Sequence, residues 1–426
     1  MMIRSSILRL GVGLLLLSLA LVPDVFAQSG PISGKHIVLL KAGVSPAVVA
    51  ARHGVRPEFV YGTAVNGFAG VIPPGRLRAL QSDPRVAAIV QDNAVYALAK
   101  PGGGGSFTGQ VTPAGVYRVG AAPGPLAYTG AGIGVAVIDT GVDLAHPDLA
   151  ARNAFSAYGG SAQDDNGHGT HVAGIIAALN NGIDVVGVAP DAQIFAVKVL
   201  DGSGSGSDAS VIAGLDYVAA NANRVTPPIR VVNMSLGRAA SSDDSAMRTA
   251  IHNVVNLGIT VVVAAGNDCG TEVSQQVPAG FSEVIAVAST TAKDGTWNRF
   301  NYFISRDTAS YFTTDGPGTA ISAPGEDQEN VSNGYFLSSV GILSTRLGGG
   351  TTRMSGTSMA APHAAGVAAL LYQQAGGNLA PSAVRSKLAA GASEVTFAPK
   401  DSPTACYSYD GVREGVLSAP GALAAP

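Results

Sequence analysis

Five short apolar runs that alternate with helical patterns constrain the fold of this chain more than any other feature. The runs are rich in β-branched residues and cover 133–138, 193–199, 230–234, 259–264 and 284–288. Runs of this kind are typical of strands buried on both faces of a parallel sheet. Helical patterns cover 171–179, 210–222, 243–257 and 359–374, with Asp243 placed to cap one helix and Gly258 to end it. The order predicts an α/β fold with a doubly wound, mostly parallel sheet, while 297–347 shows no regular pattern.

A smaller unit precedes this region. The sequence predicts a strand at 36–41, a helix at 45–53 capped by Ser45, two strands within 59–72 that turn near Asn66, a helix at 74–81 and a strand at 86–98. This β-α-β-β-α-β order is the ferredoxin-like unit. The Pro-Gly-Gly-Gly-Gly-Ser tract at 101–106 then forms a linker that a protease can reach. We expect chain cleavage between Leu98 and Gln110.

The N-terminus has the pattern of a secretory signal. Arg4 and Arg9 precede an apolar run at 11–22, and small residues lead up to Ala27. A transmembrane anchor is the alternative, but the run is shorter than the ~20 apolar residues that a span requires. We expect cleavage after Ala27 and a secreted, extracellular or periplasmic protein with no membrane partner after signal removal.

Composition narrows the class of protein further. Hydrophobic residues make up 46% of the chain and charged residues 13%, so a large core can be buried. The net charge is −3 and no basic patch is interleaved with aromatics, which argues against nucleic acid as a partner. The two cysteines, Cys269 and Cys406, fit an oxidising compartment. They form either one disulfide or two unrelated buried thiols.

Three short strings carry the groups that nucleophilic acyl transfer requires. They are Ile-Asp-Thr-Gly at 138–141, Asn-Gly-His-Gly-Thr-His at 166–171 and Ser-Gly-Thr-Ser-Met-Ala at 355–360. A hydroxyl becomes a nucleophile when an imidazole takes its proton, and a carboxylate holds that imidazole in one tautomer. We therefore expect the side chains of Asp139, His168 and Ser358 to lie within bonding contact.

Each of these residues could instead have a purely structural or metal-binding role. Asp139 follows a buried strand and could only cap a turn, and Asp143 is a competing carboxylate. His168 and His171 could form a metal pair, but the Glu of zinc-binding helices does not follow His168, and His171 is expected to be a buried structural histidine. Ser358 precedes an apolar helix and could be a plain N-cap, whereas its backbone N–H lies where a helix dipole favours negative charge.

The order Asp, His, Ser and the glycines around each residue resemble the subtilisin-like serine proteases (subtilases), in particular the proteinase K-like and aqualysin-like branch. The resemblance covers nearly all of the chain after residue 110, and the ferredoxin-like unit resembles the family's prosegment. It selects Asp139 over Asp143 and implies that Asn267, in the string Ala-Ala-Gly-Asn at 264–267, is an oxyanion-hole donor beside the Ser358 amide.

The resemblance also implies a substrate cleft and a calcium site. Extended substrate would lie between two walls and pair with them backbone to backbone. The residues expected in these walls are Gly204, Gly206, Ser235, Leu236, Gly237, Ala264, Ala265 and Gly266. No acidic residue occurs near 276–279, which favours apolar or uncharged side chains in the primary pocket. The calcium ligands implied are Gln110, Asp148, Leu179, Asn181, Ile183 and Val185.

Together these observations predict a signal peptide at 1–27, a prosegment with its linker at 28–107 and a catalytic domain at 108–426. The chain is expected to be a monomeric serine endopeptidase that acts on proteins or peptides and is inhibited by its own prosegment. Two alternatives are a peptide-binding protein that has lost turnover and an enzyme silenced by its prosegment. The stretch 326–339 is expected to be an insertion, with no function assigned.

Overall fold

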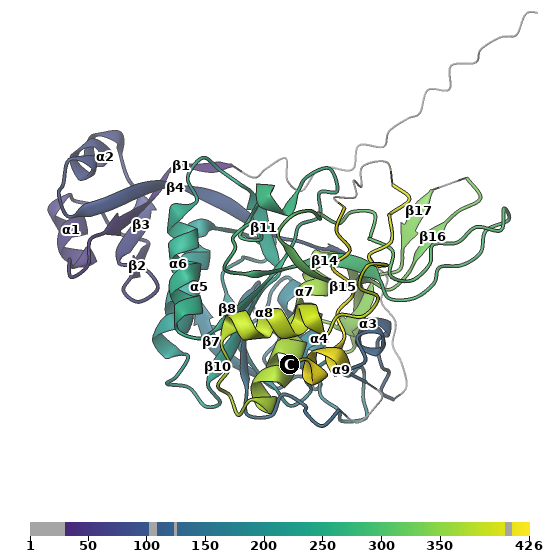
Figure 1. The fold of residues 1–426 in the computed structure, drawn as a ribbon. Helices are drawn as coiled ribbons and strands as arrows, with labels where there is room; N and C mark the ends of the chain where they lie inside the picture. The colour runs from purple at the N-terminus through teal and green to yellow at the C-terminus, as the bar shows by residue number, and fades with distance from the viewer. Residues whose placement is uncertain (1–29, 102–108, 123–125, 335, 405–410) are drawn as a thin grey trace, which may run out of the picture.

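The computed structural model describes residues 30–101, 109–122, 126–334, 336–404 and 411–426. The predicted signal peptide and most of the glycine-rich linker lie outside these residues. Figure 1 shows the N-terminal unit at one end of the molecule and the β16–β17 hairpin at the opposite end. Within the described residues, no helix combines the length and apolarity needed to cross a bilayer.

A parallel sheet of seven strands forms the centre of the fold, in the order β15-β14-β12-β10-β6-β8-β7. Its strands are β6 Gly134–Asp139, β7 Ala151–Ser156, β8 Gln193–Lys198, β10 Ile229–Met234, β12 Thr260–Ala264, β14 Ile285–Thr291 and β15 Thr319–Glu326. Five of them match the predicted runs. The predicted α/β fold is therefore confirmed.

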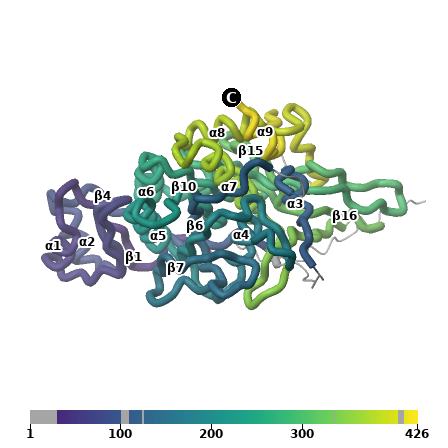
Figure 2. The backbone as a smooth tube through the Cα atoms, turned by 90° about the horizontal axis from the view of Figure 1, so that it is seen from below, coloured from purple at the N-terminus to yellow at the C-terminus, as the bar shows by residue number. Residues whose placement is uncertain are grey.

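Helices cover both faces of this sheet (Figures 1 and 2). They are α3 Ala114–Arg118, α4 His168–Ala177, α5 Asp208–Asn221, α6 Ser245–Asn256, α7 Thr357–Gln374, α8 Pro381–Ala390 and α9 Ala419–Ala424, with a 3₁₀ turn, η2, at Val273–Gln275. Val135 and Val137 of β6 share a core with α4 and α7, whereas Ala136 and Ile138 share a second core with α5 and α6. The alternation of side chains along one strand thus joins two apolar cores.

The helix starts differ from those expected because local caps decide them. Helix α5 begins at Asp208 since Ser207 and Ser210 form a reciprocal capping box. Helix α6 has Asp244 as N-cap instead of Asp243, although Asp243 Oδ1 accepts the Ser245 N–H at 3.0 Å. Gly258, with φ of 81°, follows α6 as predicted.

The N-terminal unit contains β1 Pro31–Leu40, α1 Pro46–Arg52, β2 Phe59–Tyr61, β3 Gly67–Val71, α2 Pro74–Gln81 and β4 Val86–Ala97. Its strands are antiparallel in the order β4-β1-β3-β2, as the ferredoxin-like prediction required. Ser45 occupies the N-cap of α1, but its side chain makes no capping hydrogen bond, so the predicted cap is wrong in that respect. Pro46 at the first helical position supplies the start signal instead.

The sheet of the N-terminal unit continues into the rest of the chain. Strand β4 pairs with β9 Ser205–Ser207 and with β11 Leu236–Ala239, which pairs in turn with β13 Gln276–Val277. Beyond β4, β5 Lys100–Pro101 adds to β19 Thr351–Ser355, the partner of β18 Ile342–Thr345. Strands β16 Glu329–Val331 and β17 Leu337–Ser339 form a separate hairpin.

Candidate active site

Asp139 is the last residue of β6 and is buried at the carboxyl end of the sheet. Its Oδ1 accepts the Thr140 N–H at 2.7 Å and lies 2.7 Å from Nδ1 of His168. Both side chains are buried, so little water screens the Asp139 carboxylate. This carboxylate therefore favours the tautomer of His168 that carries its proton on Nδ1. Asp143 instead accepts from the N–H groups of Ala145 and Gly348 and so holds two loops together.

His168 is the first residue of α4, not a residue before it, and the residue is 3% exposed. The N-cap Gly167 has φ of 107°, a conformation that L side chains rarely adopt. Gly169 is equally constrained because a Cβ there would lie 2.0 Å from the Gly141 carbonyl oxygen. The two glycines that flank His168 therefore allow the helix start to approach the end of β6 closely.

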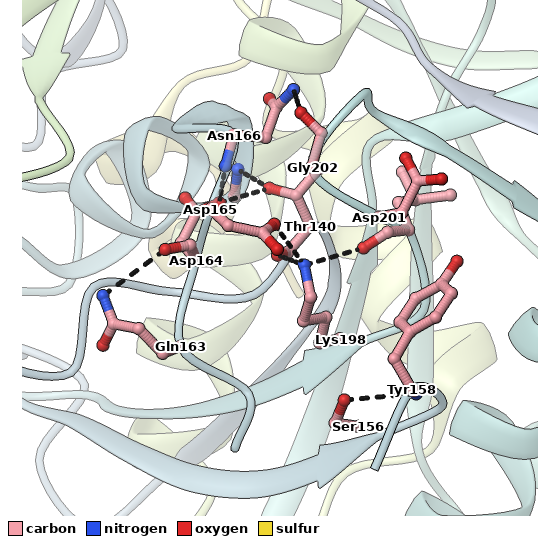
Figure 3. Close-up of polar contacts among 12 residues, drawn as sticks. Thr140, Ser156, Tyr158, Gln163, Asp164, Asp165, Asn166, Lys198, Asp201 and Gly202 are labelled. Carbon is pink, nitrogen blue, oxygen red and sulfur yellow. Dashed lines mark hydrogen bonds and ion pairs between the residues drawn. The ribbon is translucent and has the colours of Figure 1, made fainter. Parts of the chain in front are cut away.

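Asp164 connects the segments that carry Asp139 and His168 (Figure 3). Its carboxylate accepts from Thr140 Oγ1 at 2.9 Å, from the N–H groups of Asn166 and Gly167 at 3.0 Å, and from both the N–H and the hydroxyl of Thr170. Thr140 Oγ1 in turn accepts the Gly169 N–H at 2.9 Å. Asp164, which is buried, thus fixes the start of α4 relative to β6.

Lys198 adds a second constraint beside Asp139. Its buried ammonium donates to the carbonyls of Thr140 at 2.7 Å and Leu200 at 3.0 Å and to Asp165 Oδ1 at 2.6 Å (Figure 3). These three acceptors satisfy all three ammonium protons. The ammonium group of Lys198 thus fixes the residues that follow the ends of β6 and β8.

Ser358 is the second residue of α7, which begins at Thr357, so the helix starts earlier than predicted. Pro362 has no N–H to bond the Ser358 carbonyl, and that carbonyl accepts the Ser235 hydroxyl at 2.8 Å instead. The Ser358 hydroxyl donates to the Ser235 carbonyl at 2.9 Å. His168 Nε2 has no hydrogen-bond partner. The expected contact between nucleophile and base is therefore not formed, whereas the one between Asp139 and His168 is.

Asn267 lies just after β12 and its amide has a defined orientation. Its Oδ1 accepts both the N–H and the hydroxyl of Thr357 at 2.9 Å, which leaves Nδ2 as the outward donor. That Nδ2 donates to the carbonyl oxygen of Leu98 at 2.8 Å. Asn267 therefore already holds a peptide carbonyl where the resemblance placed an oxyanion.

Gly356 shows how close this carbonyl is to the start of α7. A Cβ at position 356 would lie 2.4 Å from the Leu98 carbonyl oxygen and 3.1 Å from Asn267 Nδ2. Gly356 also has φ of 156°. Only glycine leaves room for a peptide carbonyl between the start of α7 and Asn267.

The end of β4 lies between the predicted substrate walls. Ala94, Val95 and Tyr96 pair with β9, and Tyr96 and Ala97 pair with β11, both antiparallel. The Ala97 N–H donates to the Gly204 carbonyl at 3.0 Å and the Leu98 N–H to the Ser235 carbonyl at 3.3 Å.

The Leu98 side chain is buried in the same apolar cluster as Ala264. Its Cδ1 would lie 3.2 Å from a Cβ at Gly237. The expected walls at 204–206 and 235–237 therefore lie on either side of an extended segment of this chain.

Further contacts attach the N-terminal unit to α5. Asp92 Oδ1 accepts the Ala209 N–H at 3.0 Å, and the Tyr61 hydroxyl donates to the Ala209 carbonyl at 3.0 Å. Asp216 accepts the N–H groups of residues 62–64. Asp92 is almost fully buried, and burial raises its pKa to about 6.

The predicted calcium ligands converge in the structure. Gln110 Nε2 lies 2.6, 3.3 and 2.9 Å from the carbonyl oxygens of Leu179, Ile183 and Val185. Asp148 Oδ1 is buried without a hydrogen-bond partner, and burial raises the pKa of this carboxyl to about 7. Asn181 Oδ1 accepts the Ile183 N–H at 3.1 Å. Three carbonyls and an unpartnered carboxylate oxygen fit a hard cation, although the described residues contain no cluster of three acidic, His or Cys side chains suited to a metal.

His171 does not form a metal pair with His168. Its ring is fully buried, Nε2 lies 3.0 Å from the Ile342 carbonyl, and burial lowers its pKa to about 3. His171 is therefore neutral and structural, as expected. Of the two cysteines, Cys269 is not a free thiol, and Cys406 lies outside the described residues, so their pairing stays a prediction.

Comparison with known proteins places this geometry in a family. The model of the subtilase family, Peptidase_S8, matches residues 130–410. The chain belongs to the subtilase family. It is 39% identical over 347 residues to the extracellular serine proteinase of Thermus sp. (strain Rt41A). The matched region covers 79% of this chain and 73% of that protein. It is 36% identical over 334 residues to subtilisin E of Bacillus subtilis (strain 168), 77% of this chain and 75% of that protein. Subtilases are serine proteinases, and this subtilase is therefore a hydrolase.

Sequence reasoning missed three contributors to the site of this subtilase. Thr357 orients Asn267, Asp164 joins the strand end to α4, and Leu98 lies between the expected substrate walls. Thr357 lies within the third motif, directly before Ser358, and Asp164 lies four residues before His168, so their positions were a usable signal. Leu98 was only an end point of the range for cleavage, because its place depends on pairing with segments more than 100 residues away.

Proposed function

We propose that this subtilase is a secreted serine endopeptidase made as a precursor that cleaves its own Leu98–Ala99 bond. One observation carries the proposal: the Leu98 carbonyl accepts a hydrogen bond from Asn267 Nδ2 at 2.8 Å, while the residues before it pair with both cleft walls. Lys100 and Pro101 pair with β19 on the other side of this bond. The chain is thus held on both sides of Leu98–Ala99 as a substrate would be.

The chemistry follows from the groups around this bond. The Ser358 hydroxyl leaves the Ser235 carbonyl, gives its proton to His168 Nε2 and attacks the carbonyl carbon of Leu98. Asn267 donates to the oxyanion that forms, and Asp139 stabilises the imidazolium. His168 then passes the proton to the departing nitrogen of Ala99, and the C–N bond breaks. Water, deprotonated by His168, releases Leu98 as a free carboxylate.

The same contacts support inhibition by the prosegment. Strand β4 fills the cleft, and the Tyr61 and Asp92 contacts hold the unit on α5. Cleavage at Leu98–Ala99 removes none of these contacts, since they all lie on the N-terminal side of the bond. The prosegment therefore remains bound as a product inhibitor until it dissociates or is degraded, and the enzyme then acts on other proteins.

Purified precursor tests the proposal. Wild-type precursor should yield a fragment ending at Leu98 and a mature chain beginning at Ala99 by mass spectrometry, at a rate independent of protein concentration, because the cleavage is intramolecular. Ser358→Ala should stay intact and fail to react with a fluorophosphonate. Leu98→Asp places a charge in the buried pocket and should slow cleavage or shift its position. A Ser358→Ala precursor that still cleaves itself would refute the proposed role of Ser358.

The same experiment separates the alternatives. A protein that only binds peptides should remain at full length and stay unlabelled by the fluorophosphonate. An enzyme silenced by its prosegment should be cut at Ala99 yet stay inactive on casein until the prosegment is removed. The presence of Asp139, His168, Asn267 and Ser358 in one site favours turnover.

We also propose a structural calcium ion held by the carbonyls of Leu179, Ile183 and Val185 with Asp148, Asn181 and the amide oxygen of Gln110, whose amide would turn to present its oxygen in place of Nε2. The convergence of the three carbonyls and the unpartnered Asp148 oxygen support it. When bound, calcium would neutralise the buried carboxylate and tie the chain after Gln110 to the loop at 179–185. Export of a monomer with Cys269 and Cys406 joined is part of the same proposal, supported by the extracellular relative and by Cys269 not being a free thiol.

A further inference from the structure

Two segments project together from the end of the molecule opposite the prosegment, and we call them the finger (residues 293–306, with 328–334 and 336–341). Figure 1 shows the β16–β17 hairpin and a neighbouring loop extending side by side. The N–H and hydroxyl of Thr296 both donate to Asn330 Oδ1, at 2.7 and 2.9 Å. The Arg299 N–H donates to Asn333 Oδ1 at 2.9 Å near the tip. The finger is therefore one bonded unit that includes most of the predicted insertion.

Buried charged groups anchor the base of the finger. Asp327 is 2% exposed, and its Oδ2 lies 3.1 Å from Lys293 Nζ and 2.7 Å from Arg353 Nη1. Glu326 accepts the N–H groups of Val340 and Gly341. These contacts fix both segments to the end of β15, so the finger has a defined position relative to the catalytic domain.

The finger exposes large aromatic side chains. Trp297 is 60% exposed, Phe300 48%, Tyr302 44% and Phe336 76%. Scattered exposed apolar residues are ordinary, but here four large aromatic side chains are exposed on two segments that are hydrogen-bonded to each other. Trp and Tyr are enriched where proteins meet the interface between membrane and water, since their rings combine an apolar body with a polar group.

The charge of the finger differs in sign from that of the whole chain. The finger carries Lys293, Arg299 and Arg306 against Asp294 and the buried Glu329, a formal charge of +1 (3 − 2), whereas the chain as a whole has a net charge of −3. Lys293 and Arg306 are paired with Asp327 and Asp307 at the base of the finger. The Arg299 guanidinium lies 4.6 Å from the centre of the Phe300 ring. Basic side chains next to exposed aromatics match a surface that is anionic outside and apolar beneath.

We propose that the finger docks the enzyme on anionic lipid bilayers. The finger projects from the body of the molecule (Figure 1), and a projecting tip fits a broad flat partner better than the pockets in which protein hot spots are buried. The docking is peripheral, and it departs from the expectation that the secreted protein has no membrane partner. It would hold the cleft close to proteins that are themselves attached to the bilayer.

The only tryptophan of the chain, Trp297, makes the test direct. Full-length Ser358→Ala protein should co-sediment with vesicles of phosphatidylglycerol and phosphatidylcholine but not with phosphatidylcholine alone. Its tryptophan emission should shift to shorter wavelength on binding, and both signals should weaken with added salt. Absence of co-sedimentation with the anionic vesicles at low salt would overturn the proposal.

Variants identify the surface that binds. Arg299→Gln should weaken partitioning about fivefold, the effect of one basic residue near an anionic surface, and Phe336→Ser should weaken it at least as much. Tyr117→Ser removes an equally exposed aromatic residue (66%) outside the finger and should have no effect. Equal loss in the Tyr117 variant would refute the assignment to the finger. An emission shift caused by unfolded casein but not by vesicles would also overturn the proposal, in favour of a protein partner.

Discussion

Replacing Asp92 by asparagine should remove a pH dependence from the proposed inhibition by the prosegment. Asp92 lies on β4 and accepts the Ala209 N–H at the start of α5. The carboxylate of Asp208 faces it, and Asp208 is bound to Arg238 and to Asn93. Burial is the largest cause of the raised pKa of Asp92, and the negative charge of Asp208 adds to it.

The size and sign of the effect follow from that pKa. In the complex the pKa of Asp92 is about 6, against an ordinary 3.8. Between these values the bound prosegment holds a proton that the free prosegment has lost, so binding weakens as pH rises through this window and is constant above it. The difference corresponds to roughly 3 kcal/mol, or about 10²-fold in the dissociation constant between pH 4 and pH 7.

The assay is the inhibition constant of added prosegment against mature enzyme, measured with a small peptide substrate from pH 4 to pH 8. The amide introduced by Asp92→Asn can still accept from Ala209 but does not titrate. The variant prosegment should therefore inhibit with little pH dependence and more tightly than wild type at pH 7. Glu58→Gln, which changes an exposed prosegment carboxylate, is the matched control. Parallel profiles for wild type and Asp92→Asn would refute the reasoning.

Four other changes have defined outcomes. Asn267→Ala should lower kcat by about 10²–10³, a magnitude known from a subtilisin, with little change in KM, by steady-state peptide hydrolysis. Asp164→Asn should lower kcat by a larger factor than it changes KM, because the carboxylate positions His168 without touching substrate. An unchanged kcat in steady-state assays would contradict this. Chelation of calcium should lower the unfolding temperature of the wild type but not of Asp148→Asn, by calorimetry. Burial raises the pKa of Glu329 to about 8. Its contribution to the free energy of unfolding therefore declines as pH rises from about 5 to 8. Glu329→Gln should flatten that decline, measured by denaturant unfolding of the Ser358→Ala protein.

The central sheet could be predicted because its strands are buried on both faces and therefore apolar throughout. Strand β7, with the sequence Ala-Arg-Asn-Ala-Phe-Ser, was missed since it lies at the sheet edge and none of its residues is fully buried. Strand β15 was missed because Pro324 and Gly325 interrupt its apolar pattern. The finger was recognised only as an unexplained insertion, because its two segments are joined by contacts that no local pattern encodes.

The site was predictable where one residue and its neighbours in sequence carry the role. The motif glycines pointed to Asp139, His168 and Ser358, and the family match pointed to Asn267. The hydrogen bond that the Ser358 hydroxyl donates to the Ser235 carbonyl was not predictable, because it depends on how α7 packs against the end of β10. The occupant of the cleft was not predictable either, since strand addition joins segments distant in sequence.

Under the proposed self-cleavage, residues 94–98 lie along the cleft that receives other proteins after maturation, so the first substrate of this enzyme is its own chain. Any redesign of the primary pocket to take a new side chain must be accompanied by a matching change at Leu98, or maturation stalls before the altered specificity can be observed. Leu98 can thus serve as a genetic reporter of pocket preference, with the yield of mature enzyme as its signal.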